Sequence, residues 1–312
     1  MAVVTREHET QQAAEAQGAA IRRRQRANEV AQKFVIYLLL AAGAVIFIAP
    51  FVWMVTASLQ DVGDMFRWPP SWIPRNPSFD NYTEFFKQER IGRYFFNSAF
   101  VALTVTSLQL FTSSLAAYTF AKRRFPGRDL LFIITLGTLM IPGQVTLIPN
   151  YVILKNIPFF GGNDAFGSGG HGWLDSYWGL IVPQGASAFG IFLLRQYMKS
   201  IPDDLLDAAR VDGGTEFRIY AEVVMPLCRP ALAALGIFTF TYVWDDFFWP
   251  LVIISSEELR TLPLGLALFV VRNRTVWDLL MAGSVITTVP VLLVFLFFQR
   301  HFIRGIAVTG MK

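Results

Sequence analysis

The stretch Asp207-Ala-Ala-Arg-Val-Asp-Gly-Gly214, continued by Thr-Glu-Phe-Arg-Ile-Tyr-Ala-Glu-Val-Val-Met-Pro226, decides how this chain is organised. It is a polar, helix-forming island between two long apolar stretches. Paired glycines end its first helix, and Pro226 leads back towards the next apolar stretch. A helix of this kind suits docking onto another protein. The alternative is an ordinary surface helix between two membrane spans.

The composition around the island is that of a membrane protein. Hydrophobic residues make up 54% of the 312 residues and charged residues only 16%, which excludes a typical soluble domain. The basic residues follow membrane topology, so we expect no nucleic-acid partner. The single cysteine, Cys228, excludes an internal disulfide and a thiolate metal cluster, and we expect no metal.

Six apolar stretches are long enough to cross a hydrocarbon layer of about 30 Å, which takes about 20 helical residues. Backbone polar groups have no partner in lipid, so we expect each stretch to be helical. Pro142 and Gly143 predict a kink in the third. The stretches are 34–59, 95–121, 130–154, 177–198, 231–254 and 277–298.

Basic residues give the orientation. Lys122, Arg123, Arg124 and Arg128 share one short connection, and an arginine cluster at 22–26 precedes the first span. Lys and Arg accumulate on the cytoplasmic side, so we expect both termini and the loop 199–230 in the cytoplasm. Residues 1–33 are polar and are expected to form a mobile cytoplasmic tail. Residues 34–312 form the membrane domain.

The island itself has helix start and stop signals. We expect Ser200 to cap the helix, with Pro202 in the first turn and Asp203 favoured by the helix dipole. We expect Gly213 and Gly214 to end it in the left-handed conformation. The expected apolar face consists of Leu205, Leu206, Ala208 and Ala209.

These residues resemble a known family. Asp207-Ala-Ala-x-x-Asp212-Gly213-Gly214, followed by Val223-x-Met225-Pro226, is similar to the EAA loop of permease subunits in ABC-type importers. The likeness covers about residues 34 to 312 and is to the binding-protein-dependent, carbohydrate-uptake (MalG-like) branch. Further matching motifs are Asn97-Ser98, Phe125-Pro126-Gly127-Arg128, Leu147-Ile148-Pro149, Thr261-Leu-Pro-Leu-Gly265 and Met281-Ala-Gly-Ser284.

The resemblance implies a role for the island. The EAA helix would seat in a cleft of a cytoplasmic ATPase subunit and convert closure of the ATPase dimer into helix motion. Asp207 stands where the family usually has Glu, and Gly214 where Ala is common. The coupling residues that the resemblance implies are Asp207, Ala208, Ala209, Asp212, Gly213, Gly214 and Pro226. In the C-terminal segment, Gly305, Gly310 and Lys312 would reach the ATPase, the alternative being a frayed terminus.

Polar residues inside the spans are candidates for the solute pathway. Asp245 and Asp246 lie beside Trp244 and close to Trp249. Two aspartates at mid-bilayer would cost about 5–7 kcal/mol, but Asp245 lies about 21 Å along the span, in its outer third. They fit the wall of a water-filled sugar path, or else interfacial solvation and contact with a partner permease.

Gln109 and Ser113 in the second span pose a similar choice. They would line the pathway or bridge neighbouring helices, since small polar residues commonly mark helix contacts in membranes.

The sequence therefore predicts an all-helical inner-membrane permease subunit of an ATP-driven importer for a sugar or oligosaccharide. We expect no bond chemistry and no cofactor in this chain, since ATP would be bound by partner subunits. The expected partners are a second homologous permease, two ATPase subunits, an extracytoplasmic solute-binding protein and the lipid bilayer. The alternatives are import of a polyol or glycerol-phosphate-like solute by the same machinery, and a self-sufficient secondary transporter.

Overall fold

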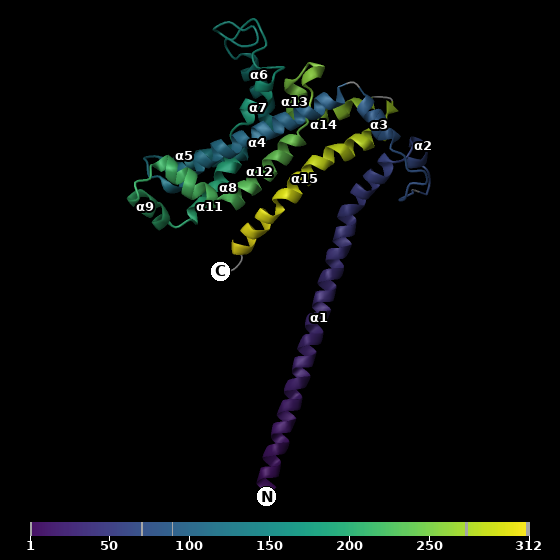
Figure 1. Ribbon diagram of the computed structural model, residues 1–312, viewed down its shortest axis with the longest axis vertical. Helices are drawn as coiled ribbons and strands as arrows, with labels where there is room; N and C mark the ends of the chain where they lie inside the picture. The colour runs from purple at the N-terminus through teal and green to yellow at the C-terminus, as the bar shows by residue number, and fades with distance from the viewer. Residues whose placement is uncertain (1, 70, 89, 272–273, 310–312) are drawn as a thin grey trace.

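The computed structural model describes residues 2–69, 71–88, 90–271 and 274–309, with side chains for 28–69, 71–88, 90–270 and 275–299. Apart from one hairpin whose two strands have two residues each, the regular structure of this part is helical (Figure 1). The α-helices are α1 (Ala2–Ser58), α2 (Val62–Met65), α3 (Asp80–Lys87), α4 (Ile91–Lys122), α5 (Arg128–Gly137), α6 (Gly143–Lys155), α7 (Tyr177–Ile181), α8 (Ala188–Lys199), α9 (Asp203–Val211), α10 (Glu216–Arg218), α11 (Met225–Leu227), α12 (Arg229–Trp244), α13 (Phe248–Ile253), α14 (Leu262–Leu266) and α15 (Trp277–Thr309). The 3₁₀ turns are η1 (Thr138–Met140), η2 (Val182–Gln184), η4 (Glu257–Leu259) and η5 (Ala267–Phe269), η3 (Ile219–Val224) is a π-helical turn, and β1 (Val270–Val271) pairs antiparallel with β2 (Arg274–Thr275).

Between four and six regions of the described chain can cross a membrane. Four are single segments, Asn28–Ser58, Ile91–Lys122, Tyr177–Lys199 and Trp277–Gln299, and two bent helix pairs raise the number to six if each pair is one span. Five of these regions coincide with apolar stretches predicted from the sequence. The second bent pair, Glu216–Leu227 and Arg229–Trp244, instead begins in the predicted loop 199–230 and covers only 231–244 of the predicted fifth stretch.

The third predicted span is sharply bent. α5 with η1 and α6 meet at an angle of 102° across Ile141 and Pro142. The predicted kink at Pro142 and Gly143 is confirmed. Proline lacks the backbone N–H that would continue the helical hydrogen bonds.

The fifth span differs from its prediction. We expected one helix over 231–254, but α12 ends at Trp244 and α13 begins only at Phe248. The Asp246 carboxylate accepts a hydrogen bond of 3.2 Å from the backbone N–H of Trp249. Aspartate side chains compete in this way with helical backbone bonds and favour helix starts. The two aspartates therefore interrupt the span.

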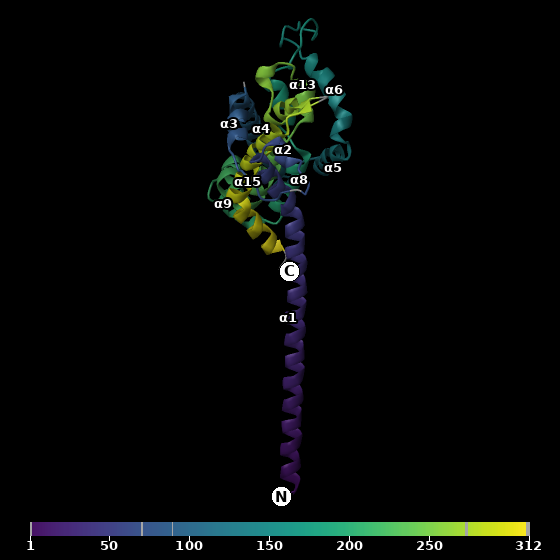
Figure 2. The same ribbon diagram turned by 90° about the vertical axis from the view of Figure 1, so that its right-hand side faces the viewer.

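The N-terminal tail is helical rather than irregular. α1 runs without interruption from Ala2 to Ser58, through the segment 1–33 in which we expected a mobile tail. Both views show α1 diverging from the bundle along most of its length (Figures 1 and 2). Within Asn28–Ser58, none of the most apolar 18-residue window is buried against the rest of this chain. The mobility of the tail stays a prediction.

The remaining long helices form a bundle around α4, which packs against α8 and α12, while α12 packs against α15. The bundle has two separate apolar cores. One contains Phe85, Tyr94 and Trp244 near the start of α4, and the other contains Tyr118 and Leu194 near its end. Between them α4 buries the polar side chains of Gln109, Ser113 and Ser114.

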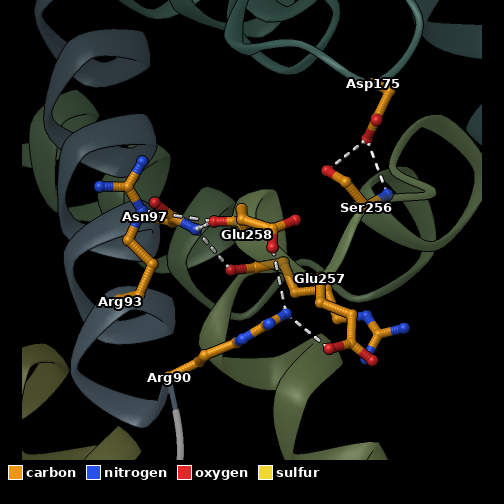
Figure 3. Close-up of polar contacts among 8 residues, drawn as sticks. Arg90, Arg93, Asn97, Asp175, Ser256, Glu257 and Glu258 are labelled. Carbon is orange, nitrogen blue, oxygen red and sulfur yellow. Dashed lines mark hydrogen bonds and ion pairs between the residues drawn. The ribbon is translucent and has the colours of Figure 1, made fainter.

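Polar contacts hold the segment after α13 against the N-terminal end of α4 (Figure 3). The Asn97 amide donates to the backbone carbonyls of Glu258 and Arg260, both at 2.8 Å. Arg90 pairs with Glu257 at 2.5 Å and with Glu258 at 3.2 Å. Surface ion pairs contribute little to stability, so the hydrogen bonds from the buried Asn97 amide contribute most to holding this segment against α4.

Asp175 also binds the segment that follows α13. Its carboxylate accepts hydrogen bonds from the backbone N–H of Ser255 and from the N–H and hydroxyl of Ser256 at 2.8–3.1 Å. Its own N–H donates to Ile253, the last residue of α13. Partial burial raises the pKa of Asp175, but the hydrogen bonds from Ser256 and Ser255 outweigh it and hold the pKa below its usual value. Asp175 thereby positions α13.

We expect Asp175→Asn to remove a pH-dependent contribution to stability. A lowered pKa in the folded state means that the charged hydrogen bonds stabilise the fold above the unfolded pKa, ordinarily 3.8, and are lost as the pH falls through the lower folded value. Asparagine also tolerates the φ of 52° at this position. The variant should lose about 1 kcal/mol at neutral pH, and its difference from the unaltered protein should begin to shrink below about pH 4 and continue to shrink as the pH falls through the lower folded pKa.

Thermal unfolding in detergent from pH 3 to pH 7 measures this effect. Asp61→Asn is the matched control, because Asp61 is exposed and its side chain makes no cap hydrogen bond. Parallel pH curves for the unaltered protein and Asp175→Asn would contradict the assignment.

Candidate functional site

The predicted docking helix is α9, which starts later than the sequence suggested. We expected Ser200 as the N-cap, but its hydroxyl donates to the carbonyl of Tyr197 at 2.7 Å, at the end of α8. Pro202 occupies the cap position, with no side-chain cap hydrogen bond. A serine between two helices can bond either neighbouring backbone, and here the carbonyl of the preceding helix accepts it.

The two glycines after α9 act differently from each other. Gly213 has φ +79° and ends the helix in the left-handed conformation, as predicted. Gly214 does not, so the expectation was wrong for this residue. A Cβ at Gly214 would lie 2.8 Å from the carbonyl oxygen of Ala209, to which its N–H donates at 2.9 Å. Gly214 therefore permits a close backbone approach.

The inner side of α9 is tightly packed. Leu206 is buried with Ile219, Tyr220 and Val224 of the following turns against Leu194 of α8. Burying a side chain of this size stabilises by about 1.5–3 kcal/mol. A displacement of α9 would therefore be transmitted to the bundle rather than absorbed in the loop.

Ion pairs reinforce this attachment. Arg210 pairs with Asp207 at 2.5 Å and with Glu216 at 3.0 Å. Glu216 also accepts from the hydroxyl of Tyr118 at 2.8 Å and pairs with Arg123. Hydrogen bonds to Glu216 and Asp207 raise the pKa of Arg210. Asp207 is thus already paired within the loop, where the resemblance implied a carboxylate directed at the ATPase.

Lys122 joins the end of α4 to the start of α9. Its ammonium group donates to the backbone carbonyl of Ile201 at 2.5 Å and to Asp203 at 2.7 Å. The hydrogen bond from Lys122 lowers the pKa of Asp203. Since the side chain of Lys122 is almost fully buried, this contact is better shielded than a surface pair.

The outer side of α9 is apolar and exposed. Of the expected face, Leu206 and Ala209 turn inward, while Leu205 and Ala208 remain exposed. Two side chains that sequence reasoning missed extend this surface, Val211 (88% exposed) and Phe217 (68%). Both flank the polar Asp212–Thr215 turn. A large apolar side chain in a water-facing loop often indicates a protein contact, and this could have identified both residues from the sequence.

A small hollow adjoins this surface. Its volume is about 210 Å³, and predicted residues Ala209, Asp212 and Gly214 line it together with Arg218 and Glu222. Pro226 lies apart from the hollow, exposed at the start of α11. Gly305 falls within α15. Gly310 and Lys312 lie outside the described residues.

A second candidate site is a cavity of about 650 Å³ between α6, η2 and the interruption of the fifth span. Predicted residues Asp245, Asp246 and Trp249 line it. Amide side chains come from Gln144, Asn150 and Gln184, and the described lining contains no Lys, Arg or His. The remaining lining residues are Gly143, Thr146, Leu147, Pro183, Tyr242, Phe247 and Phe248.

The other candidate pathway residues hold helices together. Trp244 is 1% exposed, and its indole N–H donates to the carbonyl of Thr287 in α15 at 2.9 Å. Gln109 donates to the carbonyl of Gln184 at 2.7 Å and accepts from the Thr239 hydroxyl at 3.0 Å. For Gln109, the bridging alternative matches these contacts.

Ser113 faces α8. It is fully buried, and a Cβ on Gly190 would lie 2.6 Å from its hydroxyl oxygen. Small residues at this crossing let the two helices approach closely. Among the described residues, no group of three or more His, Cys, Asp or Glu could hold a metal ion, and Cys228 is buried.

Comparisons with known proteins agree with this architecture. A family model described as "Binding-protein-dependent transport system inner membrane component" matches residues 109–308. The arabinooligosaccharide transport permease AraQ of Bacillus subtilis (strain 168) is 38% identical over 240 residues, covering 77% of this chain and 80% of that protein. The lactose permease LacG of Rhizobium radiobacter is 32% identical, covering 86% and 93%.

Two further comparisons extend the range of relatives. The sn-glycerol-3-phosphate permease UgpE of Yersinia enterocolitica is 33% identical, covering 86% of this chain and 94% of that protein. The fold matches a chain in the crystal structure of a bacterial ABC transporter that imports the acidic polysaccharide alginate. The TM-score is 0.74 at 22% sequence identity, over 86% of this chain and 95% of that one.

The family match covers residues 109–308, and these relatives align over 77–86% of the chain, on a bundle with four to six segments long and apolar enough to cross a membrane. The chain therefore belongs to the family of binding-protein-dependent transport system inner membrane components, as a permease subunit of an ABC-type importer.

Proposed function

We propose that this subunit forms half of an importer path for an uncharged sugar or oligosaccharide delivered by a solute-binding protein. The observation that carries the proposal is the charge of the cavity. Asp245 and Asp246 supply carboxylates, and Gln144, Asn150 and Gln184 supply amides, with no cation in the described lining. Carboxylate and amide oxygens accept hydrogen bonds from hydroxyl groups.

The same charges weigh against the glycerol-phosphate alternative. A phosphate about 8 Å from a carboxylate is repelled by about 1–2 kcal/mol at an effective dielectric constant of about 20–40. UgpE relatives are named for sn-glycerol-3-phosphate, so the family admits such solutes. In this chain the described cavity lining offers them no Lys or Arg partner.

The proposed topology has six spans with both termini in the cytoplasm and an EAA loop at 199–230. The bent pair Arg128–Met140 and Gly143–Lys155 then counts as one span. The fifth span consists of α12 and α13, because Glu216–Leu227 of the second bent pair lies in the loop. Residues 34–312 form the membrane domain, and the segment 1–33 precedes it on the cytoplasmic side. The cationic connection at Lys122–Arg128 supports this orientation.

The proposed partners are two ATPase subunits, a second homologous permease and the solute-binding protein. The exposed apolar face formed by Leu205, Ala208 and Val211 of α9, with Phe217 of α10 beside it, seats in an ATPase cleft. Gly305, Gly310 and Lys312 are proposed to reach the same subunit. The ATPases bind the ATP, and this chain needs no cofactor of its own. The first span, uncovered by this chain, is available to the second permease.

We expect Ala208→Trp to uncouple the importer. The side chain is exposed, so the fold should survive, while a bulky ring on the docking face should prevent close seating of α9. Solute-stimulated ATP hydrolysis by the reconstituted complex, and recovery of ATPase subunits with the tagged chain, should both fall at least about ten-fold, which corresponds to 1.4 kcal/mol.

Ala165→Trp is the control, because Ala165 is equally exposed but lies in the glycine-rich loop between α6 and α7. Normal ATPase recovery with Ala208→Trp would refute the docking face. Uptake by the purified chain alone, in ATP-free liposomes with an ion gradient, would instead support the secondary-transporter alternative.

We expect the double change Asp245→Asn and Asp246→Asn to relax discrimination against anions. Removing the two charges should raise ATP hydrolysis with an acidic oligosaccharide relative to a neutral one about ten-fold, in keeping with the repulsion estimated above. Asp61→Asn, an exposed aspartate remote from the cavity lining, is the control. An unaltered ratio would refute a charge-selective role for the cavity.

A further inference from the structure

A third hollow has no part in the proposed transport cycle. It is a groove of about 380 Å³ between α4, α12 and α15, lined by aliphatic and aromatic side chains that include Leu103, Leu110, Leu232 and Phe240. Arg229, the first residue of α12, lines the groove at the end where α12 begins. Arg229 is the one cation among the described lining residues. An apolar groove with a cation at its mouth is typical of a site for a ligand with an apolar tail and an anionic head.

The length of the groove matches one leaflet of a bilayer. From Arg229 to Phe240 the axis of α12 rises about 16 Å, at about 1.5 Å per residue. Half of the hydrocarbon layer is about 15 Å thick. In the proposed topology α12 starts at the cytoplasmic surface, so the groove extends from that surface to the middle of the membrane. The inference rests on this topology.

Arg229 is suited to an anionic head group. It is exposed and makes no ion pair or hydrogen bond within the described part of the chain. The N-terminal end of α12 adds a partial positive charge. Anionic lipids concentrate in the cytoplasmic leaflet, and basic pockets between helices on this side bind lipid head groups.

Gly236 keeps the floor of the groove open. A Cβ there would meet only Leu110 at 3.7 Å, an ordinary contact, so packing within the described chain does not require glycine.

We propose that this groove holds an acyl chain of an anionic phospholipid from the cytoplasmic leaflet, with the lipid phosphate paired to Arg229. The lipid would cover apolar surface that three helices leave open and would couple the packing of α12 to the composition of the membrane.

The test uses the full chain, with any subunits that copurify, in nanodiscs of equal parts phosphatidylglycerol and phosphatidylcholine. Native mass spectrometry then counts the lipids retained on release. We expect the unaltered protein to retain phosphatidylglycerol in preference to phosphatidylcholine. Arg229→Gln should reduce retention of phosphatidylglycerol about five-fold, as expected for the loss of one basic contact at the surface. Gly236→Leu should reduce retention of both lipids by filling the groove.

Two matched variants control for charge and bulk. Arg124→Gln removes an exposed arginine away from the groove, and Gly43→Leu adds the same side chain in the first span, where a Cβ meets nothing within 4 Å. Both should retain lipid normally, and thermal unfolding verifies that Gly236→Leu folds.

Equal retention of phosphatidylglycerol by Arg229→Gln and the unaltered protein would overturn the proposal. So would a photo-crosslink to a second protein chain from a benzophenone-maleimide attached at Ile237→Cys in the assembled complex, because a protein would then cover the groove. The lipid count needs no transport, so its failure would leave the proposed importer function standing.

Discussion

Backbone N–H and C=O groups have no hydrogen-bond partner in hydrocarbon, and this constraint governs the rest of the structure. It makes the spans helical, and it makes every interruption of a span expensive unless water reaches the exposed backbone. Among the described residues, the spans have three such interruptions outside the loop 199–230, at Ile141–Pro142, at Gly185–Ser187 and at Asp245–Phe247. Residues in or beside all three line the same 650 Å³ cavity. Three interruptions far apart in sequence therefore share one polar space, and we propose that a hydrophilic solute is accommodated there.

We propose that the end of the bundle that carries α9 is cytoplasmic. Water can solvate the backbone there, so rigidity must come from side chains. Leu206 enters the inner core while Arg210 and Glu216 tie α9 to the end of α4 through Arg123 and Tyr118. Exposed pairs contribute little individually, whereas the buried leucine and the shielded Lys122 contacts fix the orientation of the helix. The loop therefore holds α9 in a fixed orientation and leaves one apolar side of it exposed.

Sequence patterns predicted the features that depend on local chemistry. The apolar runs located five of the six candidate regions and part of the remaining one, Pro142 and Gly143 located the bend, and Gly213 located the end of α9. The features that the sequence did not predict depend on competition between neighbouring helices for the same side chain. Ser200 had two backbones within reach, and Asp246 could either continue α12 or cap α13. Trp244 and Trp249 look alike in sequence, but tertiary packing directs the indole N–H of one to Thr287 in α15 and that of the other to Gly179 in α7.

The position of Cys228 has a practical consequence. It is the one cysteine in the sequence, and it lies fully buried between α11 and α12 in the inner core. A thiol-reactive dye added to the native protein would find no accessible sulfur. Any cysteine introduced at the surface can therefore be labelled selectively without first altering the natural residue, and spectroscopic distances can be measured in an otherwise unmodified transporter subunit.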